Sequence, residues 1–288
     1  MKSIKMCTYL FNCVIIYVEL TNVISYIFHI IVYIIERSAI MELTNLIATG
    51  NSSQVYRYND QAVKVFNSNT SKVDVLLEAL NTSRVELTGL DLPHVREVTM
   101  VDGRWAILMD YIEGPTLATI MHDSPGDMEK YIDKMVDIQL NIQSKTSPLL
   151  NKLKDKLKAQ ISSLTEIDDV VKYDLMTRLD GMPKHNKVCH GDFEPRNIIV
   201  SGDKYYALDW IHASQGNASA DVARTYLLLS LSNVDMANAY MDTFCKKTGT
   251  NKRYVQQWLP IVAAAQLTKG KPEERELLLK WINVVEYE

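Results

Sequence analysis

A polar loop set between two short apolar runs is the feature of this chain that most restricts its fold. The loop contains the tripeptide His-Gly-Asp at residues 190–192, and the apolar run that follows covers residues 198–200. Asn197 lies five residues after Asp192, and a second apolar run ends at Asp209. Two strands joined by a tight turn bring the chain back on itself, so we expect two carboxylates and one amide to converge.

This convergence indicates phosphoryl transfer. One carboxylate can orient and deprotonate a hydroxyl group, and carboxylate and amide oxygens suit a magnesium ion that bridges nucleotide phosphates. The tripeptide alone could be an ordinary polar turn between strands. Its fixed spacing to Asn197 and Asp209 favours a kinase-type site instead.

The same pattern resembles a known family. His-Gly-Asp, four residues, Asn, and then Asp-Trp after a hairpin is similar to the aminoglycoside phosphotransferase and choline kinase family, over about residues 45–285. The resemblance implies ATP-dependent transfer of the γ-phosphoryl group to a hydroxyl of a small molecule, with Mg²⁺ as cofactor. It also implies a role for each loop residue: Asp192 as catalytic base, His190 as organiser of the loop, and Asn197 and Asp209 as magnesium ligands.

A kinase also needs a phosphate-binding loop and a lysine ahead of the catalytic loop. Residues 47–58 have a strand, turn, strand pattern, and residues 61–66 alternate apolar side chains around Lys64, as a buried strand facing a cleft would. An ordinary hairpin and a solvated lysine are the alternatives. The small turn residues expected near the phosphates are Gly50, Asn51 and Ser52.

The helix predicted at residues 72–87 carries two glutamates that could pair with Lys64. We favour Glu78 in its first turns over Glu86, because a carboxylate near a helix C-terminus opposes the helix dipole. A solvent-exposed Glu78 is the alternative.

Beyond this helix, Asp102-Gly103 favours a tight hairpin turn between strands predicted at residues 95–101 and 105–111. Residues 109–114 should then be the hinge to the second lobe. Backbone groups of the hinge are expected to bind adenine, and Met109 and Tyr111 are the candidates.

The remainder of the chain is predicted to be mainly helical. We therefore expect an α+β, two-lobed, protein-kinase-like fold with a small, mainly β N-lobe at residues 41–112 and a larger, mainly α C-lobe at residues 113–288. The C-lobe would hold the catalytic and substrate-binding residues. The resemblance implies that Asp221 tethers the catalytic loop; a plain helix N-cap or a first-turn carboxylate is the alternative. Helices are predicted at residues 127–143, 152–164, 170–179, 235–245, 254–266 and 273–284.

Several classes of function lack their sequence signals. Protein kinases have an arginine where this chain has Gly191 and a longer segment than the eleven residues between Asp209 and Asp221, so a protein substrate is not expected. Gly270-Lys271 is followed by proline, where a P-loop requires a hydroxyl side chain. A net charge of −4 gives no reason to expect a nucleic-acid partner, and the four cysteines have no paired spacing.

Residues 1–40 form an apolar extension with two interpretations. The uncharged run from residue 20 to residue 35 is shorter than the roughly 20 residues of a spanning helix, but it could still be a single membrane anchor. Alternatively, the start is incorrectly assigned and the working protein begins at Met41, because codons for residues 36–38 can contain a ribosome-binding AGGAG. We expect a cytoplasmic protein, and a membrane partner only if the extension is truly translated.

The acceptor substrate stays open: an aminoglycoside, choline, ethanolamine, homoserine or a sugar derivative. Arg196, where the family usually has a small residue, would favour an anionic group or face solvent. A non-catalytic nucleotide-binding regulatory protein is the alternative from another class, although the full set of site residues argues against it. A polycationic acceptor needs an acidic cleft. The candidates, which could equally be solvated surface charges, are Glu113, Asp123, Asp127, Glu286 and Glu288.

Overall fold

The computed structural model describes residues 41–283 of the chain. The chain divides into two units, Met1–Thr44 and Asn45–Glu288, and the fold that follows belongs to the second unit. The two interpretations of residues 1–40 lie outside the described residues. Within residues 41–283, no helix is both long enough and apolar enough to cross a membrane.

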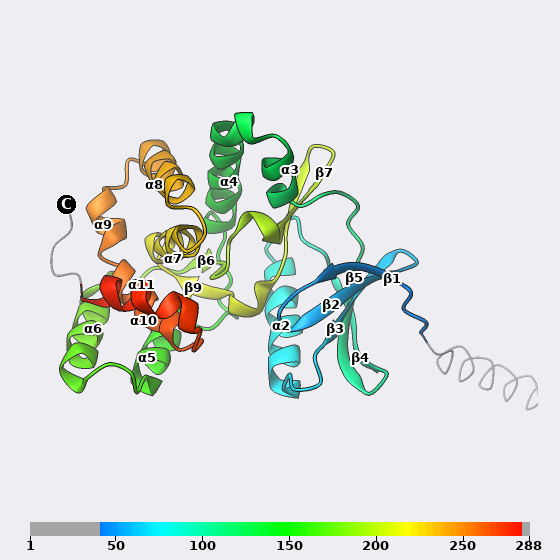
Figure 1. Ribbon diagram of the computed structural model, residues 1–288, viewed down its shortest axis with the longest axis horizontal. Helices are drawn as coiled ribbons and strands as arrows, with labels where there is room; N and C mark the ends of the chain where they lie inside the picture. Colours follow the sequence, from blue (N-terminus) through cyan, green and yellow to red (C-terminus); the bar gives the residue numbers. More distant parts are fainter. Residues whose placement is uncertain (1–40, 284–288) are drawn as a thin grey trace, which may run out of the picture. The chain divides into compact units, whose positions relative to one another are not determined.

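The N-terminal part is a five-stranded antiparallel sheet with strand order β1-β2-β3-β5-β4 (Figure 1). Asp102 and Gly103 both have positive φ angles, of 49° and 75°, as a tight hairpin between β4 and β5 requires. This confirms the hairpin predicted from Asp-Gly. The strands are β1 (Asn45–Thr49), β2 (Ser53–Tyr58), β3 (Gln61–Phe66), β4 (Val95–Val101) and β5 (Arg104–Asp110).

Helix α2 (Lys72–Glu86) packs against one face of this sheet. It begins where Ser71 accepts a hydrogen bond from the Asp74 backbone N–H at 3.1 Å, a normal helix N-cap. Val75 and Ala79 lie one helical turn apart and pack together on Phe66 and Ile107 of the sheet. Glu78 lies on the same stretch of α2, so the helix holds it against β3.

The C-terminal part is mainly helical, and with the sheet it confirms the predicted α+β, kinase-like fold class. Its core includes the fully buried rings of Tyr240, Trp210 and Trp258. The proposed lobe boundary between residues 112 and 113 stays a prediction. The helices are α3 (Leu117–Asp123), α4 (Met128–Gln143), α5 (Leu153–Ser163), α6 (Asp169–Gly181), α7 (Ala218–Ser230), α8 (Val234–Thr248), α9 (Lys252–Gln256), α10 (Leu259–Leu267) and α11 (Pro272–Ile282).

One predicted helix is divided in two. The pattern of residues 254–266 predicted a continuous helix, whereas α9 ends at Gln256 and α10 starts at Leu259. Pro260 lies in the first turn of α10. Proline has no N–H to donate and its ring clashes with the preceding turn, so it suits the start of a helix and not its interior.

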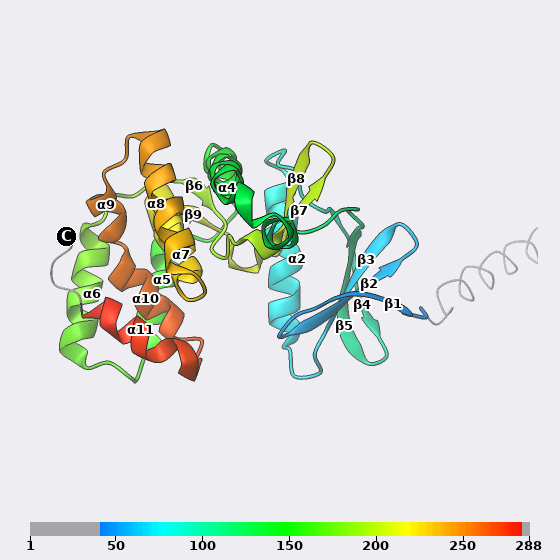
Figure 2. The ribbon, with the colours of Figure 1, turned by 45° about the horizontal axis from the view of Figure 1, so that its top comes forward.

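Between α6 and α7 in the sequence, the chain forms two small two-stranded sheets that flank the catalytic loop (Figure 2). Strands β7 (Ile198–Ser201) and β8 (Lys204–Ala207) pair in the order predicted, with Ile198 opposite Ala207. Strands β6 (Lys187–Cys189) and β9 (Ser214–Gly216) pair beside them, with Cys189 opposite Ser214. These pairings bring the ends of β6 and β8 together, so residues 190–192 lie close to residues 209–212.

Candidate active site

A cavity of about 670 Å³ is lined by residues from both the sheet and the helical part. The N-terminal part contributes the loop between β1 and β2, Lys64 of β3 and Glu78 of α2. The two small sheets contribute the catalytic loop and Asp209, which lies two residues after the end of β8. Of the residues predicted from sequence, the cavity wall contains Gly50, Asn51, Ser52, Lys64, Glu78, Asp192, Asn197 and Asp209.

Lys64 joins the two sides of this cavity. Its Nζ lies 2.5 Å from Glu78 Oε1 and 3.8 Å from Asp209 Oδ1. Glu78 is therefore the partner of Lys64, as predicted. Glu86 instead accepts a hydrogen bond from the Val95 backbone N–H at 2.8 Å and holds the end of α2 against β4.

Burial and ion pairing act in opposite directions on this pair. Burial lowers the pKa of Lys64, but the carboxylates of Glu78 and Asp209 outweigh burial and leave that pKa above its ordinary value. Burial raises the pKa of Glu78, and the Lys64 ammonium opposes this. A buried lysine held in its charged form can neutralise phosphate oxygens.

Asp192 is the carboxylate at the centre of the catalytic loop. Burial raises its pKa, but Lys269 and Arg224 outweigh burial and hold the pKa below its ordinary value, so the carboxylate is ionised at neutral pH. Asn197 donates from Nδ2 to the Asp192 backbone carbonyl at 2.8 Å and to the carboxylate at 3.3 Å. The loop thus presents a negative, oriented acceptor to the cavity.

His190 lies behind Asp192 and does not line the cavity. Its Nδ1 accepts a hydrogen bond from the Asp192 N–H at 3.2 Å, which leaves Nε2 to donate to the Leu208 carbonyl at 2.9 Å. Burial lowers the pKa of His190, so the ring is neutral and this tautomer is retained. The ring also packs on Trp210, with centroids 4.4 Å apart. The contacts fit the predicted organising role.

The residues predicted to bind magnesium provide suitable oxygen atoms. Asp209 Oδ1 is buried and has no hydrogen-bond partner among the described residues, and its closest charged group is the Lys64 ammonium. Because Asn197 Nδ2 is engaged by Asp192, the amide oxygen is left as a ligand. Both are hard oxygen donors of the kind that Mg²⁺ accepts beside phosphate groups. The donor set therefore fits the ion.

Asp221 holds the catalytic loop in place, as predicted. Its Oδ1 accepts a hydrogen bond from the Gly191 N–H at 2.8 Å, and Gln139 donates to its Oδ2 at 3.0 Å. Arg224, one turn further along α7, donates to the Gly191 carbonyl at 2.7 Å. One helix therefore binds both backbone groups of Gly191.

Besides His190, the hinge candidates Met109 and Tyr111 are predicted site residues that the structure does not bring to the cavity wall. Met109 packs with the core formed by α2 and the sheet. The Tyr111 backbone N–H donates to the Asp60 carbonyl at 3.1 Å, and the Arg57 guanidinium lies over the Tyr111 ring. Adenine binding by Met109 and Tyr111 stays a prediction.

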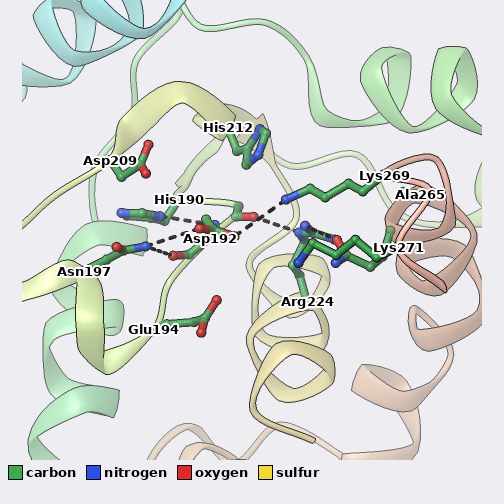
Figure 3. A network of polar contacts seen from close by, with 12 residues as sticks. His190, Asp192, Glu194, Asn197, Asp209, His212, Arg224, Ala265, Lys269 and Lys271 are labelled. Atoms are coloured by element: carbon green, nitrogen blue, oxygen red, sulfur yellow. Dashed lines mark hydrogen bonds and ion pairs between the residues drawn. The ribbon is translucent and has the colours of Figure 1, made fainter. Parts of the chain in front are cut away.

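The cavity also contains residues that the sequence patterns did not single out. Lys269 and Lys271 come from the connection between α10 and α11, and His212 follows Asp209 (Figure 3). Burial and the neighbouring cations, Lys156 first, hold the pKa of His212 far below its ordinary value. The sequence signal at Lys271 is the Gly270-Lys271 dipeptide, which by itself indicates no anion site because proline follows it.

Together, the fold and this cavity define a phosphotransferase of the kinase-like class. The sequence model of the phosphotransferase enzyme family matches residues 45–258, and the chain belongs to that family. No curated protein matches the sequence.

Solved structures of small-molecule phosphotransferases share the fold. Aminoglycoside phosphotransferase APH(4)-Ia is 15% identical with a TM-score of 0.61, over 88% of this chain and 94% of that chain. A thermostable mutant of the same enzyme, in ternary complex with AMP-PNP and hygromycin B, is 16% identical with a TM-score of 0.60, over 86% and 93%. Choline kinase LicA from Streptococcus pneumoniae is 18% identical with a TM-score of 0.54, over 86% and 91%. At such identities the likeness establishes the fold alone.

Proposed function

We propose that this protein is an ATP-dependent kinase that transfers the γ-phosphoryl group to a hydroxyl group of a small molecule. The observation that carries the proposal is one cavity wall that contains the ionised Asp192, the Lys64–Glu78 ion pair and the unpartnered oxygen of Asp209. Family membership supports phosphoryl transfer. AMP-PNP in the complex of the APH(4)-Ia mutant supports ATP as the donor.

Each residue then has a role in an in-line transfer. Asp192 accepts the proton of the acceptor hydroxyl as the acceptor oxygen forms its bond to the γ-phosphorus. The bond between that phosphorus and the β–γ bridging oxygen breaks, and ADP leaves with the electron pair. Lys64 and the backbone of residues 50–52 bind phosphate oxygens, and His190 keeps Asp192 oriented.

Mg²⁺, when bound, neutralises negative charge on the phosphates, and Asn197 and Asp209 would hold it. The adenine would lie near the hinge, where Met109 and Tyr111 remain the candidates. We further propose a cytoplasmic enzyme without a nucleic-acid or protein substrate. Choline, ethanolamine, homoserine, a sugar derivative and aminoglycosides remain alternative acceptors, because hygromycin B is named only for a structural neighbour and does not identify the acceptor of this chain.

The first test is ADP release by the full-length protein with MgATP and a panel of hydroxyl compounds. Asp192→Ala is expected to reduce turnover by roughly 100- to 10,000-fold, because general-base contributions have this size, while MgATP still binds. Asp192→Asn is the matched control, since it removes the charge and keeps the shape.

Two outcomes would contradict the proposal. Equal turnover in Asp192→Ala and wild type would remove Asp192 from the mechanism. Tight MgATP binding without ADP release for acceptors of any charge would favour the non-catalytic regulatory protein.

A further inference from the structure

The cavity wall beside Asp192 is rich in cations. Three cations line it: Arg196, Lys269 and Lys271. Arg224 and Lys156 lie behind them. Figure 3 labels Lys269, Lys271 and Arg224. None of the three lining cations has a role in the proposed binding of ATP or magnesium. Lys269 and Lys271 come from the α10–α11 connection in the helical part, and Arg196 comes from the catalytic loop.

Lys269 is the least neutralised member of this cluster. Its Nζ lies 4.0 Å from Asp192 Oδ1, and this ammonium makes no hydrogen bond to any residue between 41 and 283. The side chain is only 30% exposed and extends from the α10–α11 connection toward Asp192 (Figure 3). Burial and the nearby Arg224 lower its pKa, so the ammonium lacks enough negative charge around it.

The other cations have closer partners. Arg196 lies 2.7 Å from Glu194 Oε1 and 3.9 Å from Asp192 Oδ2, and Lys271 lies 2.7 Å from Glu274 Oε1. They therefore contribute to the field at the cavity but are already paired.

Behind the wall, Arg224 is already hydrogen-bonded. It donates to the Gly191 carbonyl and to Gln266 Oε1, both at 2.7 Å. Lys156 donates to the His212 carbonyl at 2.9 Å. Burial, Arg224 and Lys269 lower the pKa of Lys156 to about 7, which is the expected effect of several cations placed close together.

We propose that the acceptor of the phosphoryl group carries an anionic group, a carboxylate or a phosphate, and that Lys269 binds this group, with Arg196 and Lys271 beside it. This inference rests on the proposed kinase function and specifies its substrate class. An anion at Lys269 would supply the hydrogen-bond partner that this ammonium lacks. It would also place the acceptor hydroxyl next to Asp192.

The same geometry disfavours a polycationic acceptor. Of the acidic residues that could have bound one, Glu113, Asp123 and Asp127 are exposed and do not line the cavity, while Glu286 and Glu288 lie outside the described residues. Among residues 41–283, the carboxylates that line the cavity on the catalytic-loop side are Asp192 and Asp209, and both have proposed roles in the transfer itself. An acceptor ammonium would meet Lys269 and Arg196 at close range, where like charges repel.

The test compares acceptors that share one carbon skeleton and differ in charge. The probes are glycerate and glycerol 3-phosphate as anions, glycerol as the neutral compound, and 3-aminopropane-1,2-diol as the cation, each with the full-length protein and MgATP. We expect kcat/KM for ADP release to be at least about tenfold higher for one of the anions, as one charge-assisted hydrogen bond allows. A preference for the neutral or cationic compound would overturn the inference and leave the kinase function intact. If ADP is released neither with these probes nor with a wider panel of anionic, neutral and cationic acceptors, both the kinase function and the anionic acceptor would be overturned.

Variants of Lys269 test which substrate it contacts. Lys269→Gln should lower kcat/KM for the anionic acceptor by about 10- to 100-fold, through KM, and leave the KM for ATP unchanged. Lys269→Arg should restore most of the loss. Lys204→Gln, at the exposed first residue of strand β8, is the matched control and should change neither constant. A raised KM for ATP with an unchanged acceptor KM would assign Lys269 to the nucleotide and overturn the inference.

Discussion

At the scale of single residues, Gly191 is a position of the catalytic loop that favours glycine over every residue with a side chain. Its φ angle is +81°, and an added Cβ would lie 2.7 Å from the His212 carbonyl oxygen. A side chain is disfavoured both by the backbone conformation and by the contact. We expect Gly191→Ala to lower the free energy of unfolding by about 1–3 kcal/mol and to reduce turnover, measured by urea unfolding and ADP release.

Two other glycines separate the effect of the positive φ angle from the effect of the close contact with His212. Gly89 has a φ angle of +72° with no atom within 4 Å of an added Cβ, so Gly89→Ala should show the backbone cost alone, about 1 kcal/mol. Gly181, at the end of α6, has open space and no positive φ, so Gly181→Ala should be nearly neutral. If Gly191→Ala were no more harmful than Gly89→Ala, the approach to His212 would be unimportant.

Two histidines should make the fold sensitive to acid. The folded protein lowers the pKa of His190 by burial and that of His212 by burial and neighbouring cations. The unfolded chain binds protons at both near pH 6.5, so it holds more protons than the folded state below that pH. Stability should therefore fall as the pH drops from about 6.5 toward the folded-state pKa values, by up to about 1.4 kcal/mol per pH unit for each histidine.

Urea unfolding at pH 7, 6 and 5 measures this slope. His212→Asn should make the slope of unfolding free energy against pH shallower by up to about 1.4 kcal/mol per pH unit, which is the contribution of one histidine. His122→Asn is the control, because the His122 side chain is 88% exposed and should leave the slope unchanged. Identical slopes in wild type and His212→Asn would show that His212 gains no protons on unfolding in this range.

At the scale of elements, helix α7 connects stability to the catalytic loop. Asn217 caps it by accepting a hydrogen bond from the Ser219 N–H at 2.9 Å, and the helix then presents Asp221 and Arg224 to Gly191. Asn217→Ala should cost about 1–2 kcal/mol of stability and also lower turnover, because the helix start positions both contacts.

Asn251→Ala provides the comparison. Asn251 caps α9 in the same manner, by accepting from the Arg253 N–H at 2.9 Å, but α9 makes no contact with the catalytic loop through its cap. Its loss should cost about 1 kcal/mol and leave kcat unchanged. A normal kcat in Asn217→Ala, measured where the protein remains folded, would contradict the role assigned to α7.

Local patterns predicted most elements, since alternation and capping depend on neighbouring residues. The helix at residues 72–87 and the hairpin at Asp102-Gly103 were predicted from such signals and are present. The separation of α9 from α10 depends on Pro260, whose effect the apolar periodicity concealed. Lys269 lies beside Asp192 only because α10 packs on α7, and no local pattern reports that packing.

At the scale of the whole molecule, the candidate site joins two parts with separate cores. The sheet and α2 pack around Phe66 and Ile107, whereas the helical part has its own larger core. Polar contacts connect them at several points. Among these, Asn81 of α2 donates to the Ile211 carbonyl at 3.0 Å, the Ala207 N–H donates to the Asp91 carbonyl at 3.3 Å, and Lys64 lies 3.8 Å from Asp209. A nucleotide that contacts both walls of the cavity should therefore strengthen the connection between the two parts.

MgATP should accordingly stabilise both parts together. At about 100 times its Kd, a ligand adds about 2.7 kcal/mol to the free energy of unfolding. We expect hydrogen exchange to slow in β3 and α2 and equally at residues 209–212 when MgATP is added to the full-length protein. Lys64→Met should abolish the effect, because it removes the charge between Glu78 and Asp209, while Lys204→Met at the surface should preserve it. Protection confined to the sheet would mean that the nucleotide does not reach Asp209, and the magnesium role of that residue would then fail.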